Sequence, residues 1–230
     1  KEQEFHAFGF DAETLYADAI MDGDQDEYLF FHLFKMHLHN NKNITTSMQL
    51  DDVTGKTSLP AITIFKLSIK ALVDHLKDEI KKQKAPVEND EIYWVLTVPA
   101  IWTDTAKEFM RISAEDAGIK REHLLLALEP EAASIYCQYL SIEKQEGSEQ
   151  GFTMTKTDTE YMVVDLGGGT ADLTVHRKAT ENTLDEIHRV MGNDCGGTSI
   201  NKVFLKILED VVGKSVLDAI KKEAPVSYLS

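Results

Sequence analysis

A glycine-rich turn between two predicted strands contains the residues best suited to chemistry. The apolar run Tyr161–Leu166 includes Asp165, glycines occupy 167–169, and Thr170 opens an alternating stretch that ends at Val175. Such runs on either side of a glycine turn predict a β-hairpin. Glycines can adopt a positive φ and have no Cβ, so successive N–H groups can surround an anion. We therefore expect this turn to bind a phosphate group.

The residues beside the glycines suit a phosphate that carries a metal ion. Asp165 supplies a carboxylate for a hydrated metal, and Thr170 supplies a hydroxyl donor. A hairpin whose glycines only form a bend is the alternative, although three glycines between an aspartate and a threonine exceed what a bend requires. Gly196 and Gly197 precede a predicted helix, whose N-terminus is a second place for phosphate. A plain capped helix explains that second segment equally well.

Composition limits the classes of partner. The 230 residues are 43% hydrophobic and 27% charged, as in ordinary soluble globular proteins, and the formal net charge is −15. This negative field disfavours nucleic acid and anionic membrane surfaces as partners. No apolar run is long enough to insert into a membrane. The two cysteines, Cys137 and Cys195, indicate reduced thiols and a cytoplasmic protein.

Helices and strands are predicted on both sides of the hairpin. Hydrophobic periodicity, prolines and glycines define them. They are an amphipathic helix at 59–82, a strand at 92–98 that Pro99 ends, a helix up to Gly118, a strand at 124–128, a helix from Pro130 to Leu140, a strand at 184–191 and a helix capped by Thr198 or Ser199. The continuous apolar character of 92–98 predicts a strand covered on both faces.

Other segments have less regular patterns. Residues 4–10 alternate like a strand in the middle of a sheet, and the polar stretch 141–158 predicts an exposed loop between two lobes. Residues 27–39 predict a buried strand or short helix. Within them Lys35 either extends its ammonium to water or approaches an anion, and the surrounding apolar residues favour the first. The histidines of this segment match no zinc-binding spacing.

Several segments resemble one family in the same order along the chain. Asp165–Asp172, D-L-G-G-G-T-A-D, resembles the second phosphate loop of the actin-like ATPases, in particular the 70-kilodalton heat-shock chaperones. The segment around Pro99 resembles their proline switch, 128–133 resembles their E-P-x-A-A connection, and Lys35 falls where their catalytic lysine lies. The stretches W-V-L-T-V-P-A-I-W and L-E-P-E-A-A-S-I-Y-C are most similar to the heat shock 70 kDa protein 12 branch, the 12A and 12B type.

The resemblance covers nearly the whole chain and implies a fold. It is an α/β fold of the actin-like ATPase (ribonuclease H-like) type, here a partial nucleotide-binding domain with two lobes. Residues 1–88 would form the peripheral part of lobe I (IB-like), 89–158 its core (IA-like), and 159–230 the start of lobe II (IIA/IIB-like) with the phosphate loop.

The resemblance also implies roles for single residues, with ATP or ADP and Mg²⁺ as cofactors. Lys35 would touch the terminal phosphate, while Glu129 and Asp165 would hold the magnesium shell through water and orient the attacking water. The predicted nucleotide-contacting residues are Gly167, Gly168, Gly169, Thr170, Asp172, Gly196 and Gly197. Pro99 and Lys107 would relay the state of the nucleotide site to a second site. Lys107 stands where arginine is usual, and a lysine cannot make the bidentate contacts of an arginine.

The expected function is that of a chaperone-like, nucleotide-dependent switch in stress response. We expect weak ATP hydrolysis by the full-length protein and little nucleotide binding by residues 1–230 alone, because a first phosphate loop and an adenosine motif would lie outside them. A sugar or acetate kinase of the same superfamily is one alternative, and a non-enzymatic scaffold for protein partners is another. The client or partner protein is not predicted.

Overall fold

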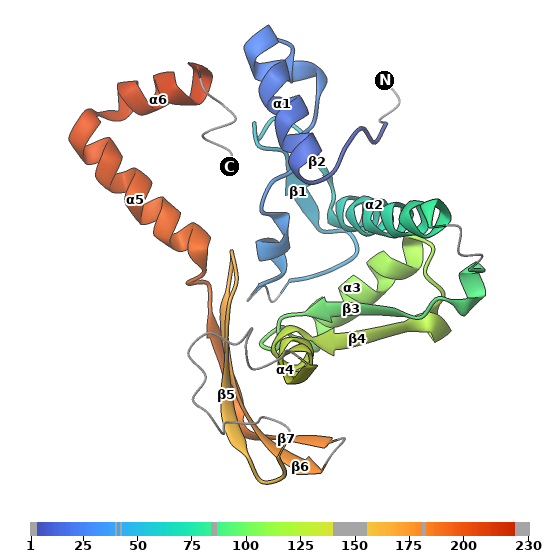
Figure 1. Cartoon of the computed structure of the whole chain (residues 1–230). Coiled ribbons are helices and arrows are strands. Elements are labelled where there is room, and N and C mark those ends of the chain that lie inside the picture. The colour runs from blue at the N-terminus through green and yellow to red at the C-terminus, as the bar shows by residue number, and fades with distance from the viewer. Residues whose placement is uncertain are drawn as a thin grey trace. The chain divides into compact units, whose positions relative to one another are not determined.

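The computed structural model describes residues 4–39, 41, 43–83, 87–139, 156–180 and 183–223. These residues form a mixed α/β structure (Figure 1). The chain divides into two compact units. Unit 1 comprises Lys1–Trp94, Asp104–Leu124 and Lys202–Ser230, and unit 2 comprises Val95–Thr103 and Leu125–Asn201.

The centre of unit 1 is a pair of amphipathic helices. Helix α2 (Ala61–Lys82) confirms the predicted helix at 59–82 and buries Ile64, Phe65, Ile69 and Val73 along one face. Helix α3 (Asp104–Asp116) packs against it. The rings of Phe65 and Phe109 meet edge to face with centroids 5.4 Å apart, a favoured aromatic geometry. As predicted, α3 is followed by Gly118, whose φ is 97°.

Short elements complete unit 1. They are the hairpin of β1 (Gln49–Asp51) and β2 (Ser58–Pro60), the 3₁₀ turns η1 (Gln25–Glu27), η2 (Phe34–Leu38), η3 (Asn89–Glu91) and η4 (Arg121–His123), and helix α6 (Lys214–Glu223).

The predicted N-terminal strand is wrong. Residues 4–8 have no regular structure, and helix α1 (Phe10–Asp22) begins where the strand was expected to continue. Gly9, with φ of 67°, turns the chain, and its carbonyl accepts the N–H groups of Ala12 and Glu13. An alternating segment forms a strand only if a partner strand binds its backbone groups. Here the backbone carbonyl of Gly9 is bound by the first turn of α1 instead.

The segment 27–39 is irregular up to Leu33, forms the 3₁₀ turn η2 after it, and is buried only in part. Phe30 and Leu38 are buried, whereas Leu33 and Lys35 are exposed. The expectation of general burial was therefore wrong. The cause is the left-handed backbone of Leu33 (φ 53°), which breaks the alternation immediately before η2 begins.

Unit 2 contains two small sheets. Strand β3 (Trp94–Val98) pairs with β4 (Leu124–Leu128), and β4 runs directly into helix α4 (Glu129–Tyr139). The predicted coverage of β3 on both faces was wrong, since Val95 is 60% exposed and Leu125 on β4 is 62% exposed. An apolar run therefore indicated a strand correctly but not burial of both its faces.

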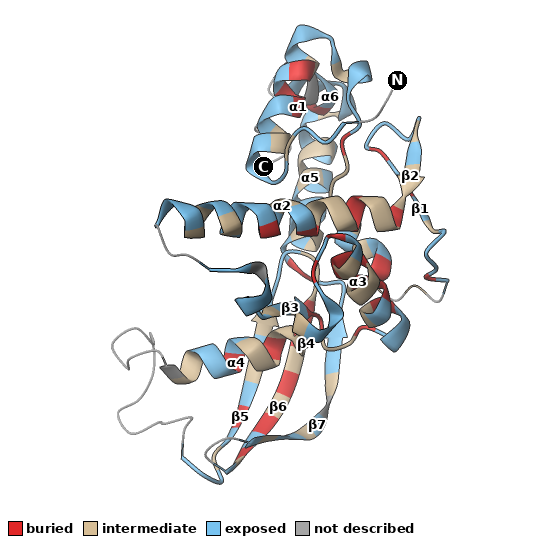
Figure 2. Cartoon of the chain, turned by 90° about the vertical axis from the view of Figure 1, so that its right-hand side faces the viewer, coloured by how far each residue is buried: buried red, intermediate tan, exposed pale blue. Residues whose placement is uncertain are grey.

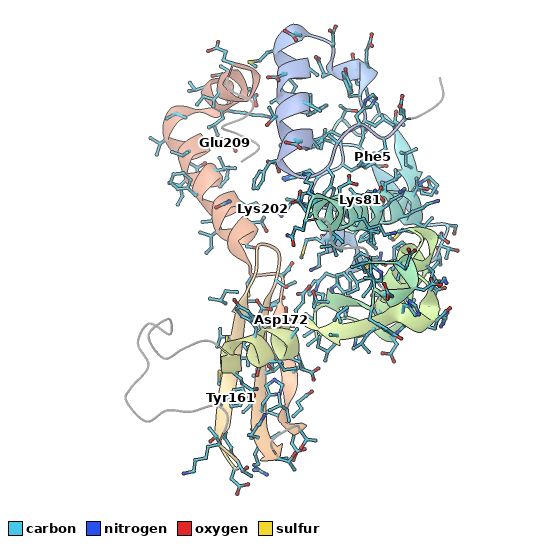
Figure 3. All side chains as sticks on the ribbon, turned by 45° about the vertical axis from the view of Figure 1, so that its right-hand side comes forward. Phe5, Lys81, Tyr161, Asp172, Lys202 and Glu209 are labelled. Carbon is cyan, nitrogen blue, oxygen red and sulfur yellow. The ribbon has the colours of Figure 1, made fainter. Side chains whose placement is uncertain are left out.

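The second sheet contains the predicted hairpin and third strand. Strands β5 (Glu160–Leu166), β6 (Ala171–Thr180) and β7 (Thr183–Asn193) are antiparallel in the order β5-β6-β7. Tyr161 and Asp172 lie near opposite ends of the β5–β6 hairpin (Figure 3). Residues 141–155 of the predicted loop at 141–158 lie outside the described residues.

One face of β6 is polar yet buried. Asp172, Thr174, His176 and Lys178 alternate along the strand and are all buried, as the red bands on β6 show (Figure 2). Helix α4 packs against β5 and β6. The Lys178 ammonium donates to Gln138 Oε1 on α4 over 3.0 Å, and His176 Nε2 lies 2.8 Å from Thr174 Oγ1. The buried polar groups are thus largely satisfied by neighbours, as a stable interior requires.

Helix α5 (Gly197–Val212) follows β7 after a short turn. Its predicted apolar positions form one face with helical spacing, but Ile200, Val203, Phe204 and Ile207 are exposed. None of the helices among the described residues has the length and apolar character needed to cross a membrane.

Candidate functional site

The glycine turn joins β5 to β6 and is closed by one backbone hydrogen bond. The N–H of Gly167 donates to the carbonyl of Thr170 over 2.9 Å. The strand register places Leu166 opposite Ala171 and Asp165 opposite Asp172. The predicted hairpin is therefore confirmed, with two carboxylates on facing positions next to the turn.

The start of α5 contacts the carbonyl groups of this turn. The N–H of Gly197 donates to Gly167 O (3.1 Å), that of Thr198 to Gly168 O (2.8 Å) and that of Gly196 to Gly169 O (3.2 Å). The Thr198 hydroxyl also donates to Gly168 O over 2.8 Å. The first N–H groups of a helix lack partners within the helix, so they are available to other acceptors. Here the glycine carbonyls are those acceptors.

This contact fixes the direction of the N–H groups in the turn. All peptide bonds of the described residues are trans, so each N–H points away from the carbonyl of its own peptide plane. The carbonyls of residues 167, 168 and 169 face α5, and the N–H groups of Gly168, Gly169 and Thr170 therefore lie on the other side of the turn. Within the described residues, the N–H groups of Gly168 and Gly169 donate no hydrogen bond. Adjacent N–H groups directed to one side make an anion-binding hollow.

Close approach, and not positive φ, requires glycine at one position of this region, Gly196. Gly167 and Gly168 do not adopt the left-handed backbone that the sequence led us to expect. A Cβ on Gly196, however, would lie 2.6 Å from Gly167 O and 2.6 Å from the carbonyl carbon of Gly169. Only a glycine at 196 allows α5 to begin this close to the turn.

Two carboxylates lie together at the base of the turn. Asp165 is half-buried, while Asp172 is 1% exposed and its Oδ1 receives no hydrogen bond from the described residues. Facing like charges on neighbouring strands repel each other. A cation beside this pair would remove the repulsion and supply the missing partner of Oδ1.

Gly192 on β7 packs beside Asp172. A Cβ on Gly192 would lie 2.8 Å from Asp172 Oδ1 and 2.9 Å from Ile101 Cγ2. Asp172 and the segment that follows Pro99 therefore surround the same glycine. Pro99 itself is fully buried.

The other predicted site residues lie on different elements. Glu129 is the first residue of α4 and belongs to unit 2, like the turn. Lys35 is an exposed residue of η2, and Lys107 is a half-buried residue of α3; both belong to unit 1. Their roles beside a nucleotide stay predictions. The N–H groups of Gly196 and Gly197 already bind the turn, which gives these two glycines a supporting position.

Sequence reasoning did not assign three residues of this region, Thr198, Gly192 and Ile101. Thr198 was considered only as a helix cap. The two glycines before Thr198 indicated a close approach, but the partner of that approach is 27–30 residues earlier in the chain, at 167–169. Periodicity within single elements does not reveal such a contact.

The chain has known relatives along almost its whole length. It is 30% identical to human heat shock 70 kDa protein 12B over 98% of the chain. It is 31% identical to human heat shock 70 kDa protein 12A over 99% of the chain. The chain belongs to the heat shock 70 kDa protein family. This confirms the family that the motifs of the sequence resemble.

The chain spans 40% of the length of each of these two human proteins. The chain is also similar, over a shorter stretch, to the chaperone protein DnaK of Elusimicrobium minutum. The two are 31% identical over 53% of the chain and 17% of that protein. No family model matches the chain.

Proposed function

We propose that this chain is part of an ATP-binding, ATP-hydrolysing nucleotide-binding domain of the actin-like ATPase fold that acts as a chaperone-like switch. One observation supports this above all others: the glycine carbonyls bind the start of α5, and the N–H groups of the turn are left for an anion. Family membership makes the phosphates of ATP or ADP the anion that we propose. The reduced cysteines suggest a cytoplasmic location, and protein clients are part of the same proposal.

Residues of the turn fit a phosphate group bound with Mg²⁺. Mg²⁺ binds through one or two carboxylates, with phosphate oxygens and water completing its shell. Asp165 and Glu129 would hold this shell through water, and the buried Asp172 carboxylate adds negative charge beside it. When bound, Mg²⁺ neutralises charge on the phosphates.

The chain's own groups would position the phosphates and the attacking water and would not form a covalent bond with them. The N–H groups of Gly168, Gly169 and Thr170 bind phosphate oxygens, and the Thr170 hydroxyl adds a donor. Gly196 and Gly197 hold the turn in place through their hydrogen bonds. Glu129 and Asp165 accept hydrogen bonds from water and orient it, and Lys35 would neutralise the terminal phosphate. Phosphoryl transfer to water depends mainly on such positioning and charge stabilisation.

The test is a measurement of single-turnover ATP hydrolysis by the full-length protein. We expect slow hydrolysis that requires Mg²⁺ and that falls on the order of 10- to 100-fold in Asp165→Asn, as for other changes in a metal's outer shell. Asp185→Asn is the matched control, because Asp185 lies on the same sheet, opposite Arg177 and away from the turn. Absence of ATP binding by the wild-type protein, or equal loss in both variants, would contradict the proposal.

A further inference from the structure

The Thr198 hydroxyl makes a contact that its own helix does not need. A threonine near a helix N-terminus commonly accepts a hydrogen bond from an N–H of the same helix. In α5 the Thr198 hydroxyl instead donates to Gly168 O, 30 residues earlier, over 2.8 Å. The neighbouring Ser199 hydroxyl supports the entry to the helix, since it donates to Asp194 O over 2.6 Å. The two adjacent hydroxyls therefore serve different partners.

Gly168 O thus accepts two hydrogen bonds from one residue. The backbone N–H of Thr198 and its hydroxyl both lie 2.8 Å from this oxygen. The same peptide plane contains the N–H of Gly169, which points to the opposite side of the turn. Two donors on the carbonyl polarise the peptide, and this makes the opposite N–H a stronger donor.

We propose that Thr198 is a positioning residue of the phosphate-binding turn: its hydroxyl holds the 168–169 peptide so that the Gly169 N–H, and not the Gly168 carbonyl, faces the phosphate. This rests on the proposed nucleotide-binding function. Without the hydroxyl the peptide keeps one of its two hydrogen bonds and rotates more easily. A rotated peptide directs a carbonyl oxygen at the anion, which repels it.

Variants of the full-length protein distinguish the effect of the Thr198 hydroxyl from the effect of side-chain shape and of the neighbouring hydroxyl. Thr198→Val removes the hydroxyl and keeps the shape, Thr198→Ser keeps the hydroxyl, and Ser199→Ala removes the neighbouring hydroxyl as a matched control. Titration calorimetry would measure the affinities for Mg-ATP and for adenosine, which has no phosphate. We expect Thr198→Val to weaken Mg-ATP roughly 3- to 10-fold, the usual effect of one hydrogen bond. Thr198→Ser and Ser199→Ala keep wild-type affinity, and adenosine affinity is unchanged throughout.

A spectroscopic measurement tests the same inference without nucleotide. The amide resonance of Gly169 is expected to shift in Thr198→Val and to stay in place in Thr198→Ser and Ser199→Ala. Should Thr198→Val not fold, Thr198→Ala takes its place in both measurements.

Three results would overturn the inference while leaving nucleotide binding intact. These are wild-type affinity in Thr198→Val, equal losses in Thr198→Val and Thr198→Ser, and an equal loss in Ser199→Ala. Failure of the wild-type full-length protein to bind Mg-ATP is a different outcome. It would overturn the proposed function and, with it, this inference.

Discussion

Two adjacent glycines, Gly196 and Gly197, have different steric requirements. A Cβ at 196 would lie 2.6 Å from backbone atoms of the turn, whereas a Cβ at 197 would have no atom within 4 Å. We expect Gly196→Ala to destabilise the protein by about 1–3 kcal/mol, as overpacking does, since backbone atoms cannot move aside like a flexible side chain. Thermal unfolding of the full-length protein measures this change.

Gly197→Ala is the control for that substitution. Alanine is favoured over glycine within a helix, and Gly197 is the first residue of α5. This variant should therefore unfold at or slightly above the wild-type temperature. Equal destabilisation by both substitutions would mean that the close approach at Gly196 is not what requires glycine.

Asp52, between β1 and β2, gives stability a defined pH dependence. Burial raises the pKa of Asp52, but hydrogen bonds from the Thr54 hydroxyl and from the N–H groups of Thr57, Thr54 and Lys56 outweigh it and hold the pKa below its ordinary value. A lowered pKa means that the ionised group stabilises the fold above the unfolded-state pKa. This stabilisation is lost as the pH falls through the folded-state pKa.

Asp52→Asn should therefore lower stability at neutral pH by about 1.5–3 kcal/mol, the range for hydrogen bonds to a charged group. The difference from wild type should begin to shrink below pH of about 4, the ordinary pKa of an aspartate, and disappear only below the lowered folded-state pKa of Asp52, where the wild-type carboxyl is neutral as well. Urea unfolding at several pH values measures this. The neighbouring Asp51 is exposed, and Asp51→Asn should stay within about 0.5 kcal/mol of wild type.

At the scale of elements, α4 is fixed to the sheet by a buried pair of hydroxyls. Ser134 Oγ and Tyr161 Oη lie 2.7 Å apart and join α4 to β5. Removing either hydroxyl leaves the other buried without its partner, which costs about 1–3 kcal/mol. We expect Ser134→Ala and Tyr161→Phe each to destabilise the protein by this amount, and the double variant to lose much less than the sum.

A double-mutant cycle in urea measures this coupling. Tyr136→Phe is the control, because Tyr136 lies on the same helix but is exposed. Additive losses in Ser134→Ala and Tyr161→Phe would show that the two hydroxyls do not depend on each other. Because Glu129 begins the same helix, the pair also bears on the position of this predicted site residue.

Elements with strong local patterns were predictable from the sequence. The helical spacing of apolar residues in α2 and the glycines between β5 and β6 define these elements without any distant contact. Residues 4–8 show the opposite case, since their alternation predicts a strand only if a partner strand exists. Instead, the carbonyl of Gly9 accepts the first hydrogen bonds of helix α1, and the alternating pattern does not predict this helix.

The candidate site was predictable in its residues but not in its arrangement. The motif around Asp165 identifies the turn, because a phosphate loop needs glycines and a carboxylate close together in sequence. The contact with Thr198 joins residues 30 positions apart. It depends on how β7 returns the chain to the turn, so only the fold reveals it.

At the scale of the whole molecule, the chain spans 40% of the length of the two human relatives, heat shock 70 kDa proteins 12A and 12B. A phosphate turn alone offers few contacts to a nucleotide, and the adenosine part needs its own pocket. We expect calorimetry to detect weak or no Mg-ATP binding by residues 1–230 and clear binding by the full-length protein. Tight binding by residues 1–230 would refute this expectation.

The proposed relay through Pro99 also belongs to this scale. Pro99 is fully buried, and Ile101, two residues later, packs around Gly192 together with Asp172. The proline segment and the carboxylate at the base of the turn therefore lie beside the same glycine. We expect Pro99→Ala in the full-length protein to reduce the effect of nucleotide on affinity for a protein client. Unchanged coupling would count against the relay.

The hydrogen bonds between the glycine carbonyls and α5 exist before any ligand arrives. Ordering a flexible loop at the moment of binding opposes association through lost entropy, whereas a loop ordered during folding has already lost that freedom. On the proposed function, the turn would therefore meet an anion as a preorganised receptor. Its selectivity should depend on the charge and size of the anion and little on an adaptive change in the turn.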